Sequence, residues 1–448
     1  MRTNPIPSDR TGSFRRSTPI RRLTAPIRRF LKIEAASGAV LLACTALALA
    51  LANSAWATPY HDFWEMHLRI GVGTWELDEP LHFWVNDLLM AIFFFVVGLE
   101  IKREIVAGEL SSVKKAALPV IAAIGGMVVP AAIYLAFNHT GPAERGWGVP
   151  MATDIAFVVG VMAAFGPRVP FGLKIFLLSL AIADDMGAVL VIAVAYTDDL
   201  DLVMLALAAG GFGVVVLMNR LGIRSVGLYT LVGAGIWLAV YRAGIHPTVA
   251  GVLLGLLTPA RPWLNRETLR LALTKVTGQL DDASDVVELR PADVAILRYA
   301  AREAVSPLQR IEDRLHPWVG FAIMPVFALA NAGVEIRPAA ILDPVALAIV
   351  AGLVLGKTAG IVGFSYLAVK LGLARLPRGT TWPMLLAAGV LGGIGFTMSL
   401  FIANLAFPAP PELLIAAKTG IIAGSAIAAI AGAGLLAWST RRGGVSLL

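Results

Sequence analysis

Long apolar stretches separated by short polar segments dominate the pattern of the chain. The first runs from residue 35 to 57, and the others cover 83–101, 116–137, 147–166, 171–196, 201–219, 226–243, 246–259, 317–334, 345–369, 382–406 and 413–438. An α-helix rises about 1.5 Å per residue, so most of these stretches are long enough to cross a hydrocarbon core of roughly 30 Å. The pattern predicts an all-α polytopic membrane protein with about twelve transmembrane helices.

The composition agrees with this prediction. Hydrophobic residues make up 57% of the 448 residues and charged residues 15%, whereas a soluble domain carries about 25% charged residues. Cys44 is the only cysteine, so the chain forms no internal disulfide. The net charge of +7 could suggest a nucleic-acid partner, and the placement of the charges decides against one.

Lys and Arg gather on one side of the predicted spans. With the basic N-terminal segment placed in the cytoplasm, 31 of the 37 basic residues fall on that side, counting 9 in residues 1–32, 9 in residues 260–315 and 13 in other loops. Four (Arg69, Arg145, Arg242 and Arg337) fall outside, and Lys357 and Lys418 lie within spans. This asymmetry predicts that both termini are cytoplasmic and that the surrounding partner is a lipid bilayer rather than nucleic acid.

The remaining segments complete the predicted organisation. Residues 1–33 are expected to form a disordered basic cytoplasmic tail, 34–440 a twelve-helix membrane domain and 441–448 a cytoplasmic C-terminus. Within the domain, 58–81 is predicted as a polar segment on the outer face, and 260–315 as a cytoplasmic connection containing a short amphipathic helix over 281–304. Ala55-Trp56-Ala57 resembles a signal-peptidase site. We expect the first helix to be retained, because the basic region before it is too long for a signal peptide.

Two adjacent acids stand in the middle of the span 171–196. Asp184 and Asp185 have nine apolar residues before them and ten after them, which argues against a capping turn at the membrane surface. Each carboxylate at this depth costs roughly 2.5–3.5 kcal/mol by insertion scales. Lys357, deep in the span 345–369, is the expected partner for one of them. Consecutive helical residues point about 100° apart, so the other acid is left for a different ligand.

Two spans carry signs of an interrupted helix. In one, Thr153 and Asp154 follow Pro150, which removes a backbone donor. In the other, residues 389–395 include four glycines, followed by Thr397 and Ser399; close packing is the alternative explanation for these glycines. Both spans are the middle members of three-span groups, 116–196 and 345–438. Interruptions in matching positions point to a transporter site between inverted repeats.

This set of groups predicts a chemistry. A small hard cation such as Na⁺ prefers oxygen ligands, here carboxylates, the Thr153 hydroxyl and freed carbonyls. Protons and the cation would compete for the same oxygens, and competition with alternating access gives exchange of one for the other. The sequence contains no G-x-x-x-x-G-K-[ST] motif, so we expect an ion gradient as the driving force and no resident cofactor.

The chain resembles the NhaA family of bacterial sodium/proton antiporters. The resemblance rests on NDLLMAIFFFVVGLEIKRE (86–104), ATDIAF (152–157), KIFLLSLAIADDMGA (174–188), GIHPTVAGV (244–252), HPWVGFAIMPVFALANAGV (316–334), GKTAGI (356–361) and GGIGFTMSLFIANLAF (392–407). It implies twelve helices, two of them interrupted and crossing, in the bacterial inner membrane. It also implies electrogenic export of Na⁺ (or Li⁺) for inward H⁺, rising at alkaline pH, for sodium and pH homeostasis, and a homodimer.

The resemblance also implies roles for individual residues. Asp185 looks like the cation ligand and Asp184 like the residue that pairs with Lys357. Thr153 and Asp154 lie at the first interruption, where Asp154 would compensate helix-end charges, and Lys357 would act similarly.

The family's pH-regulating residues map onto Glu100, Arg103, Glu104, Glu312 and His316, with His246 at a further position linked to pH response. Histidine titrates in the appropriate range. A structural hydrogen-bonding residue is the alternative reading of His246. The family often has a second histidine where this chain has Asp313, so the expected pH profile is less well defined.

Three other functions are compatible with acids in a membrane. An intramembrane aspartyl protease takes its two carboxylates from separate helices, one in a Gly-x-Gly-Asp motif, and this tetrapeptide does not occur in the chain. A passive cation channel is opposed by the buried lysine and would not require proton movement. A transporter for an organic anion is disfavoured by two carboxylates at the midplane. We expect a transporter rather than an enzyme, with segment 58–81 as the dimer contact.

Overall fold

The computed structural model describes residues 19–72, 75–197, 200–223, 225–262, 295, 304–335 and 337–443. The longer helices in these ranges are α1 (Pro19–Ala52), α2 (Ala57–Trp64), α4 (Met90–Ala107), α5 (Val113–Phe137), α6 (Ile155–Phe165), α7 (Phe171–Ala195), α8 (Leu202–Arg220), α9 (Val226–Arg242), α10 (Thr248–Leu257), α13 (Pro307–Trp318), α14 (Met324–Asn331), α15 (Pro344–Ala351), α16 (Lys357–Lys370), α17 (Trp382–Leu391), α18 (Phe396–Ala406) and α19 (Pro411–Gly443). The fold is almost entirely helical, as predicted.

Short elements connect or extend these helices. They are the strands β1 (His67–Val72) and β2 (Trp75–Pro80), the single turn α3 (Leu81–Phe83), the π-helical turns η1 (Trp84–Leu89), η5 (Val319–Ile323) and η7 (Gly352–Gly356), and the 3₁₀ turns η2 (Glu109–Ser111), η3 (Pro142–Met151), η4 (Gly166–Arg168) and η6 (Pro338–Leu342). The π turns run directly into α4, α14 and α16, so each pair forms one continuous helical segment.

Within the described ranges, every predicted span coincides with a helix or a pair of helices. Seven helical segments are long and apolar enough to cross a bilayer alone, and two further pairs meet at bends of 117° and 45°. The first bend separates α1 from the short helix α2, and the second is the interruption predicted in 382–406. Large apolar side chains such as Leu190, Val194 and Ile430 stay exposed. The chain is therefore a multi-pass membrane protein whose apolar surface faces lipid.

Two predicted segments, the N-terminal tail and the connection 260–315, either differ from the prediction or lie mostly outside the described residues. Helix α1 already begins at Pro19, inside the tail that was expected to be disordered. The physical reason is that Ile20, Leu23, Ile27 and Leu31 recur at helical spacing, a pattern that the count of arginines obscured. Residues 1–18, 263–294 and 296–303 lie outside the described residues, and with them most of the amphipathic helix predicted over 281–304.

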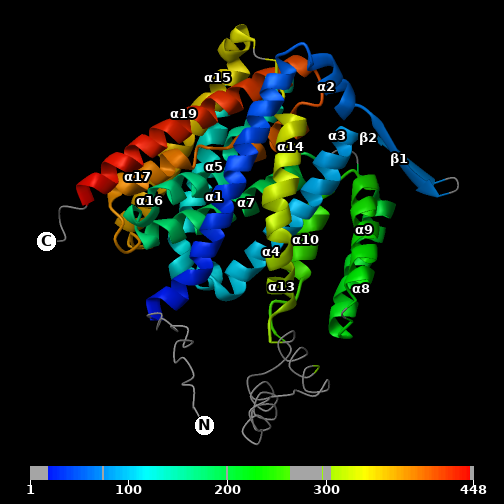
Figure 1. Ribbon diagram of the computed structural model, residues 1–448, viewed down its shortest axis with the longest axis horizontal. Helices are drawn as coiled ribbons and strands as arrows, with labels where there is room; N and C mark the ends of the chain where they lie inside the picture. The colour runs from blue at the N-terminus through cyan, green and yellow to red at the C-terminus, as the bar shows by residue number, and fades with distance from the viewer. Residues whose placement is uncertain are drawn as a thin grey trace, which may run out of the picture.

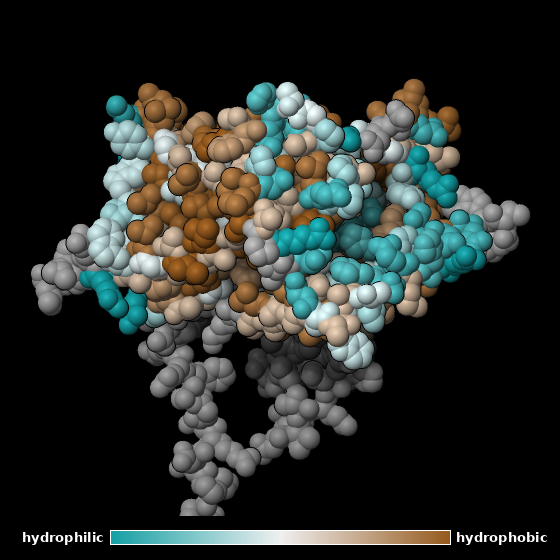
Figure 2. Space-filling model, turned by 90° about the horizontal axis from the view of Figure 1, so that it is seen from above, coloured by the Kyte–Doolittle hydropathy of each residue, from teal (hydrophilic) through white to brown (hydrophobic). Residues whose placement is uncertain are grey.

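The polar segment 58–81 contains α2 followed by a β-hairpin. Strands β1 and β2 pair antiparallel, with Leu68 opposite Glu79 and Ile70 opposite Leu77. The hairpin reaches outward beyond α9 at one edge of the molecule (Figure 1). Seen from above, hydrophobic residues gather on one side of the molecule and hydrophilic residues on the other (Figure 2).

Glycines set the distance between two pairs of helices. A Cβ added to Gly360 of α16 would lie 2.1 Å from the carbonyl oxygen of Gly125 on α5, and one added to Gly98 of α4 would lie 2.5 Å from that of Val252 on α10. Such contacts are tighter than any side chain tolerates, so the backbones meet directly. These packings hold α16 against α5, and α10 against α4, around the middle of the molecule.

Both predicted interruptions are present. In the first, η3 ends at Met151, residues 152–154 are extended, and α6 begins at Ile155. In the second, α17 ends at Leu391 and α18 begins at Phe396. Each broken span is the middle member of its three-span group, as the sequence predicts.

Candidate functional site

The two chain breaks are bonded to each other. The backbone N–H of Asp154 donates to the carbonyl of Ile394 at 2.6 Å, and the Thr153 hydroxyl donates to the carbonyl of Gly392 at 2.8 Å. Ser399 of α18 donates to the carbonyl of Val149 at 2.8 Å. Broken helices expose backbone groups that need partners inside a membrane, and here each break supplies partners for the other.

Asp154 caps the first turns of two helices. Its Oδ1 accepts from the N–H of Phe157 in α6 at 3.4 Å. Its Oδ2 accepts from the N–H of Thr397 in α18 at 3.1 Å, and the Thr397 hydroxyl donates to the same oxygen. A negative charge between two helix N-termini balances the partial positive charge of both.

Lys357 and Asp184 form a buried ion pair. The Nζ of Lys357 donates to Oδ2 of Asp184 at 2.6 Å, and the two side chains are 1% and 3% exposed. The second oxygen of Asp184 is buried with no hydrogen-bond partner among the described residues. A buried pair is neutral as a unit, and removal of either partner leaves an uncompensated charge.

Asp185 is as buried as its neighbour but has different partners. It is 3% exposed, and no Lys or Arg in the described ranges forms an ion pair with it. Instead its carboxylate lines a cavity together with Thr153, Asp154 and Thr397. The turn of about 100° between consecutive helical residues accounts for this division.

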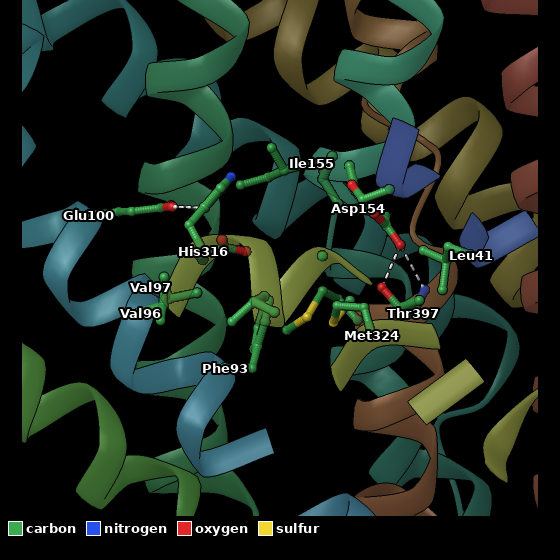
Figure 3. A pocket seen from close by; sticks show the side chains of 17 residues that line it. Leu41, Phe93, Val96, Val97, Glu100, Asp154, Ile155, His316, Met324 and Thr397 are labelled. Carbon is green, nitrogen blue, oxygen red and sulfur yellow. Dashed lines mark hydrogen bonds and ion pairs between the residues drawn. The ribbon is translucent and has the colours of Figure 1, made fainter. Parts of the chain in front are cut away.

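The cavity extends from Asp185 along the middle of α4, where Phe93 and Glu100 line it. It has a volume of about 70 Å³, which is room for several water molecules. Asp154 and Thr397 lie on one side of it, and Glu100 and His316 on the other (Figure 3). Ser37 and Leu41 of α1 also line it. Sequence reasoning missed these two, because nothing in an apolar first span distinguishes the face that covers a site.

The five residues predicted as a charged cluster are brought together. His316 Nδ1 lies 3.4 Å from Oε1 of Glu100, Arg103 donates to Glu312, and Arg103 lies 3.8 Å from Glu104. Glu312 belongs to α13, ahead of the predicted span 317–334. Burial raises the pKa of Glu312 to about 7 against the opposing pull of Arg103, and Glu100 adds to the rise.

His246 lies apart from this cluster. Its Nε2 is 3.3 Å from Oδ1 of Asp87, and its Nδ1 is 2.8 Å from the hydroxyl of Thr248. Asp87 and Glu100 are thirteen residues apart along η1 and α4, which is about 20 Å of helix. The position fits the alternative reading of His246 as a hydrogen-bonding residue.

An all-α membrane protein with two interrupted helices that cross beside buried acids belongs to the class of secondary transporters. A family model described as Na+/H+ antiporter 1 matches residues 28–436. The chain is 52% identical over 422 residues to the Na(+)/H(+) antiporter NhaA of Rhodopirellula baltica, covering 94% of this chain and 96% of that protein. It is 50% identical over 416 residues to the protein of the same name from Rhizobium meliloti, covering 92% and 94%, and 50% identical over 424 residues to Na(+)/H(+) antiporter NhaA 2 of Sorangium cellulosum, covering 92% and 90%. The chain belongs to the Na+/H+ antiporter 1 family, which is a family of transporters and not of enzymes.

Proposed function

We propose that this protein exchanges Na⁺ or Li⁺ for H⁺, with Asp185 as the group for which the two ions compete. One observation carries the proposal: Asp185 is buried beside a cavity that Glu100, Asp154 and Thr397 also line, while Lys357, the one lysine near it in the described part of the chain, is bonded to Asp184. A carboxylate in such a place is neutralised by a proton or by a bound cation. Both occupants use the same oxygens, so each displaces the other.

Asp184 and Lys357 are the second proton-handling unit. A cation bound between the two aspartates would draw Asp184 away from Lys357 toward the cation, using the second Asp184 oxygen as a ligand. Lys357, left without its counter-charge in a buried site, would release its proton to water. The Thr153 hydroxyl supplies a further oxygen. A proton from Asp185 and one from Lys357 against one Na⁺ moves net charge, which makes the exchange electrogenic.

The direction and location follow from the charge asymmetry of the loops. The basic loops favour a bacterial inner membrane with both termini in the cytoplasm. In that orientation the proton gradient drives H⁺ inward and Na⁺ (or Li⁺) outward, which serves sodium and pH homeostasis. The cavity would then open toward the cytoplasm. The cluster around Glu312 would regulate exchange with pH, and the hairpin of 67–80 would support a homodimer.

The test uses the purified protein in liposomes with a pH-sensitive dye inside. Addition of Na⁺ or Li⁺ outside should shift internal pH for the wild type and leave it unchanged for Asp185→Asn. Asp62→Asn, an exposed acid on α2, is the matched control and should exchange normally. Passage of Na⁺ without protons would indicate a channel instead, and full activity of Asp185→Asn would overturn the role of this carboxylate.

A further inference from the structure

Three helices each present one stripe of residues that leads away from the cavity toward the hairpin side. On α18 the stripe is Thr397, Phe401 and Asn404; on α14 it is Met324, Phe327 and Asn331; on η1 and α4 it is Val97, Phe94, Met90 and Asn86. Positions three, four and seven residues apart share a helix face. The innermost members, Thr397, Met324 and Val97, all line the cavity, so the stripes describe the route beyond it.

Aromatic rings close this route directly above the cavity. The ring centroid of Phe401 lies 5.5 Å from that of Phe94 and 6.3 Å from that of Phe327. All three side chains are fully buried. One phenylalanine from each helix therefore forms an aromatic plug, and a hydrated cation cannot pass through a dry contact of this kind.

Asparagines tie the same three segments together farther from the cavity, one turn beyond the phenylalanine on α14 and α18 and two turns beyond Phe94. Asn331 donates to Oδ1 of Asn86 at 2.8 Å, and its own Oδ1 accepts from Nδ2 of Asn404 at 2.7 Å. His82, two residues after the hairpin, lies 3.0 Å from the same oxygen. Asn331 is completely buried, so leaving its amide without hydrogen-bond partners would destabilise the protein. We call Asn86, Asn331 and Asn404 the asparagine latch.

We propose that the asparagine latch and the aromatic plug are the closed gate on the hairpin side of the ion route, and that the latch breaks in every transport cycle. This inference rests on the proposed exchange function. The cavity reaches Asp185 from the opposite side, so an ion at Asp185 leaves toward the hairpin only when these stripes separate. We expect α18 to move relative to α14 and α4. It begins at the break after α17, so it can tilt without bending α17.

A cleavable crosslink tests whether the latch must open. In a Cys44→Ser background, Asn331→Cys and Asn404→Cys are joined by a short thiol-reactive linker that dithiothreitol cleaves. Exchange in liposomes should disappear on linking and return on cleavage. The control pair is Asn219→Cys and Tyr229→Cys, which replaces a 2.6 Å contact between α8 and α9 and should exchange in both forms. Exchange that persists in the linked latch variant would overturn the gate.

A labelling measurement tests the same gate independently of exchange. Residue 324 lines the cavity, so Met324→Cys in the Cys44→Ser background reports access to it. An impermeant maleimide is added to membrane vesicles in which the hairpin side of the protein faces outward, and the labelling rate is measured. Adding Asn404→Leu removes one latch bond and should raise the labelling rate about fivefold. Asn219→Leu, the same substitution on α8, should leave it unchanged. Equal rates in the two variants would contradict the gate. A Met324→Cys protein whose labelling responds as expected but which moves no protons would contradict only the exchange function.

Discussion

The Lys357 ammonium donates a hydrogen bond to the Asp184 carboxylate at 2.6 Å, whereas Asp185, which follows Asp184 in the chain, has no such partner among the described residues. Two neighbouring acids on α7 therefore stand in opposite electrostatic states. Asp184 is compensated by the Lys357 ammonium, whereas Asp185 faces the cavity without a charged partner among these residues. A buried carboxylate without a counter-charge from the protein is what the proposed competition between Na⁺ and H⁺ requires.

Removal of the lysine should destabilise the protein strongly. Lys357→Met keeps the length of the side chain but leaves Asp184 as an uncompensated buried charge, a change that costs about 3–5 kcal/mol. Thermal unfolding in detergent should show a large fall in melting temperature, together with loss of exchange. Lys370→Met, at the exposed end of the same helix, should change neither.

The double variant separates charge from packing. Lys357→Met combined with Asp184→Asn removes both charges, so most of the lost stability should return. If the double variant is as unstable as the single one, the loss comes from packing, and the ion pair is not what Lys357 contributes.

The pairing of Lys357 with a single aspartate could be predicted from the sequence because it needs only the geometry of one helix. The double cap by Asp154 could not. The Thr397 N–H is 243 residues away from it along the chain, and the contact exists only because the two chain breaks cross. Local pattern identified each break, whereas the bond between them depends on how the three-span groups pack.

Loss of the double cap should destabilise more than loss of an ordinary one. Asp154→Ala leaves the first turns of α6 and α18 without an acceptor, and each lost cap costs about 0.5–2 kcal/mol. Asp201→Ala removes a single exposed cap at the start of α8 and provides the comparison. Both are measured by thermal unfolding, with exchange as a second readout. A smaller loss for Asp154→Ala than for Asp201→Ala would contradict the dual role.

The sequence predicted the charged cluster around Arg103 better than it predicted the contacts of the other polar residues. Glu100, Arg103 and His316 follow family motifs, and the fold does bring them together. His246, which the resemblance gives as a separate position linked to pH response, lies just before α10 and beside Asp87 of η1, so it is not part of this cluster. The latch asparagines gave no signal, since single amides scattered over three spans acquire meaning only when they meet.

The pH dependence of exchange should change when Glu312 can no longer titrate. With a pKa raised by burial to about 7, Glu312 is neutral below that pH and negative above it. Its ionisation adds negative charge near the Glu100–His316 end of the cavity and attracts cations. Glu312→Gln should therefore weaken the rise in exchange rate between pH 6.5 and 8, recorded in liposomes over a pH series.

A stability measurement checks the sign of the same effect. The pKa in the folded protein, about 7, lies above the ordinary value of 4.5, so the folded state loses stability as pH rises from 4.5 through 7. Glu312→Gln should remove this slope. Asp313→Asn removes a charge at the adjacent exposed position that adds the smallest part of the rise in the pKa of Glu312, so it should keep the slope of both profiles and move them only slightly to lower pH. Identical profiles for Glu312→Gln and wild type would show that another member of the cluster titrates.

Close contact between α5 and α16 should also affect transport, because α16 begins with Lys357. A Cβ at Gly360 would lie 2.1 Å from the Gly125 carbonyl oxygen, whereas one at Gly363 on the same helix meets nothing within 4 Å. Gly360→Ala should push the helices apart, lose about 1–3 kcal/mol and lower the exchange rate. Gly363→Ala should be neutral or slightly stabilising, because alanine favours a helix over glycine. Unfolding and exchange of the two variants, measured side by side, check this. Equal behaviour would mean that the close approach of these helices does not position Lys357.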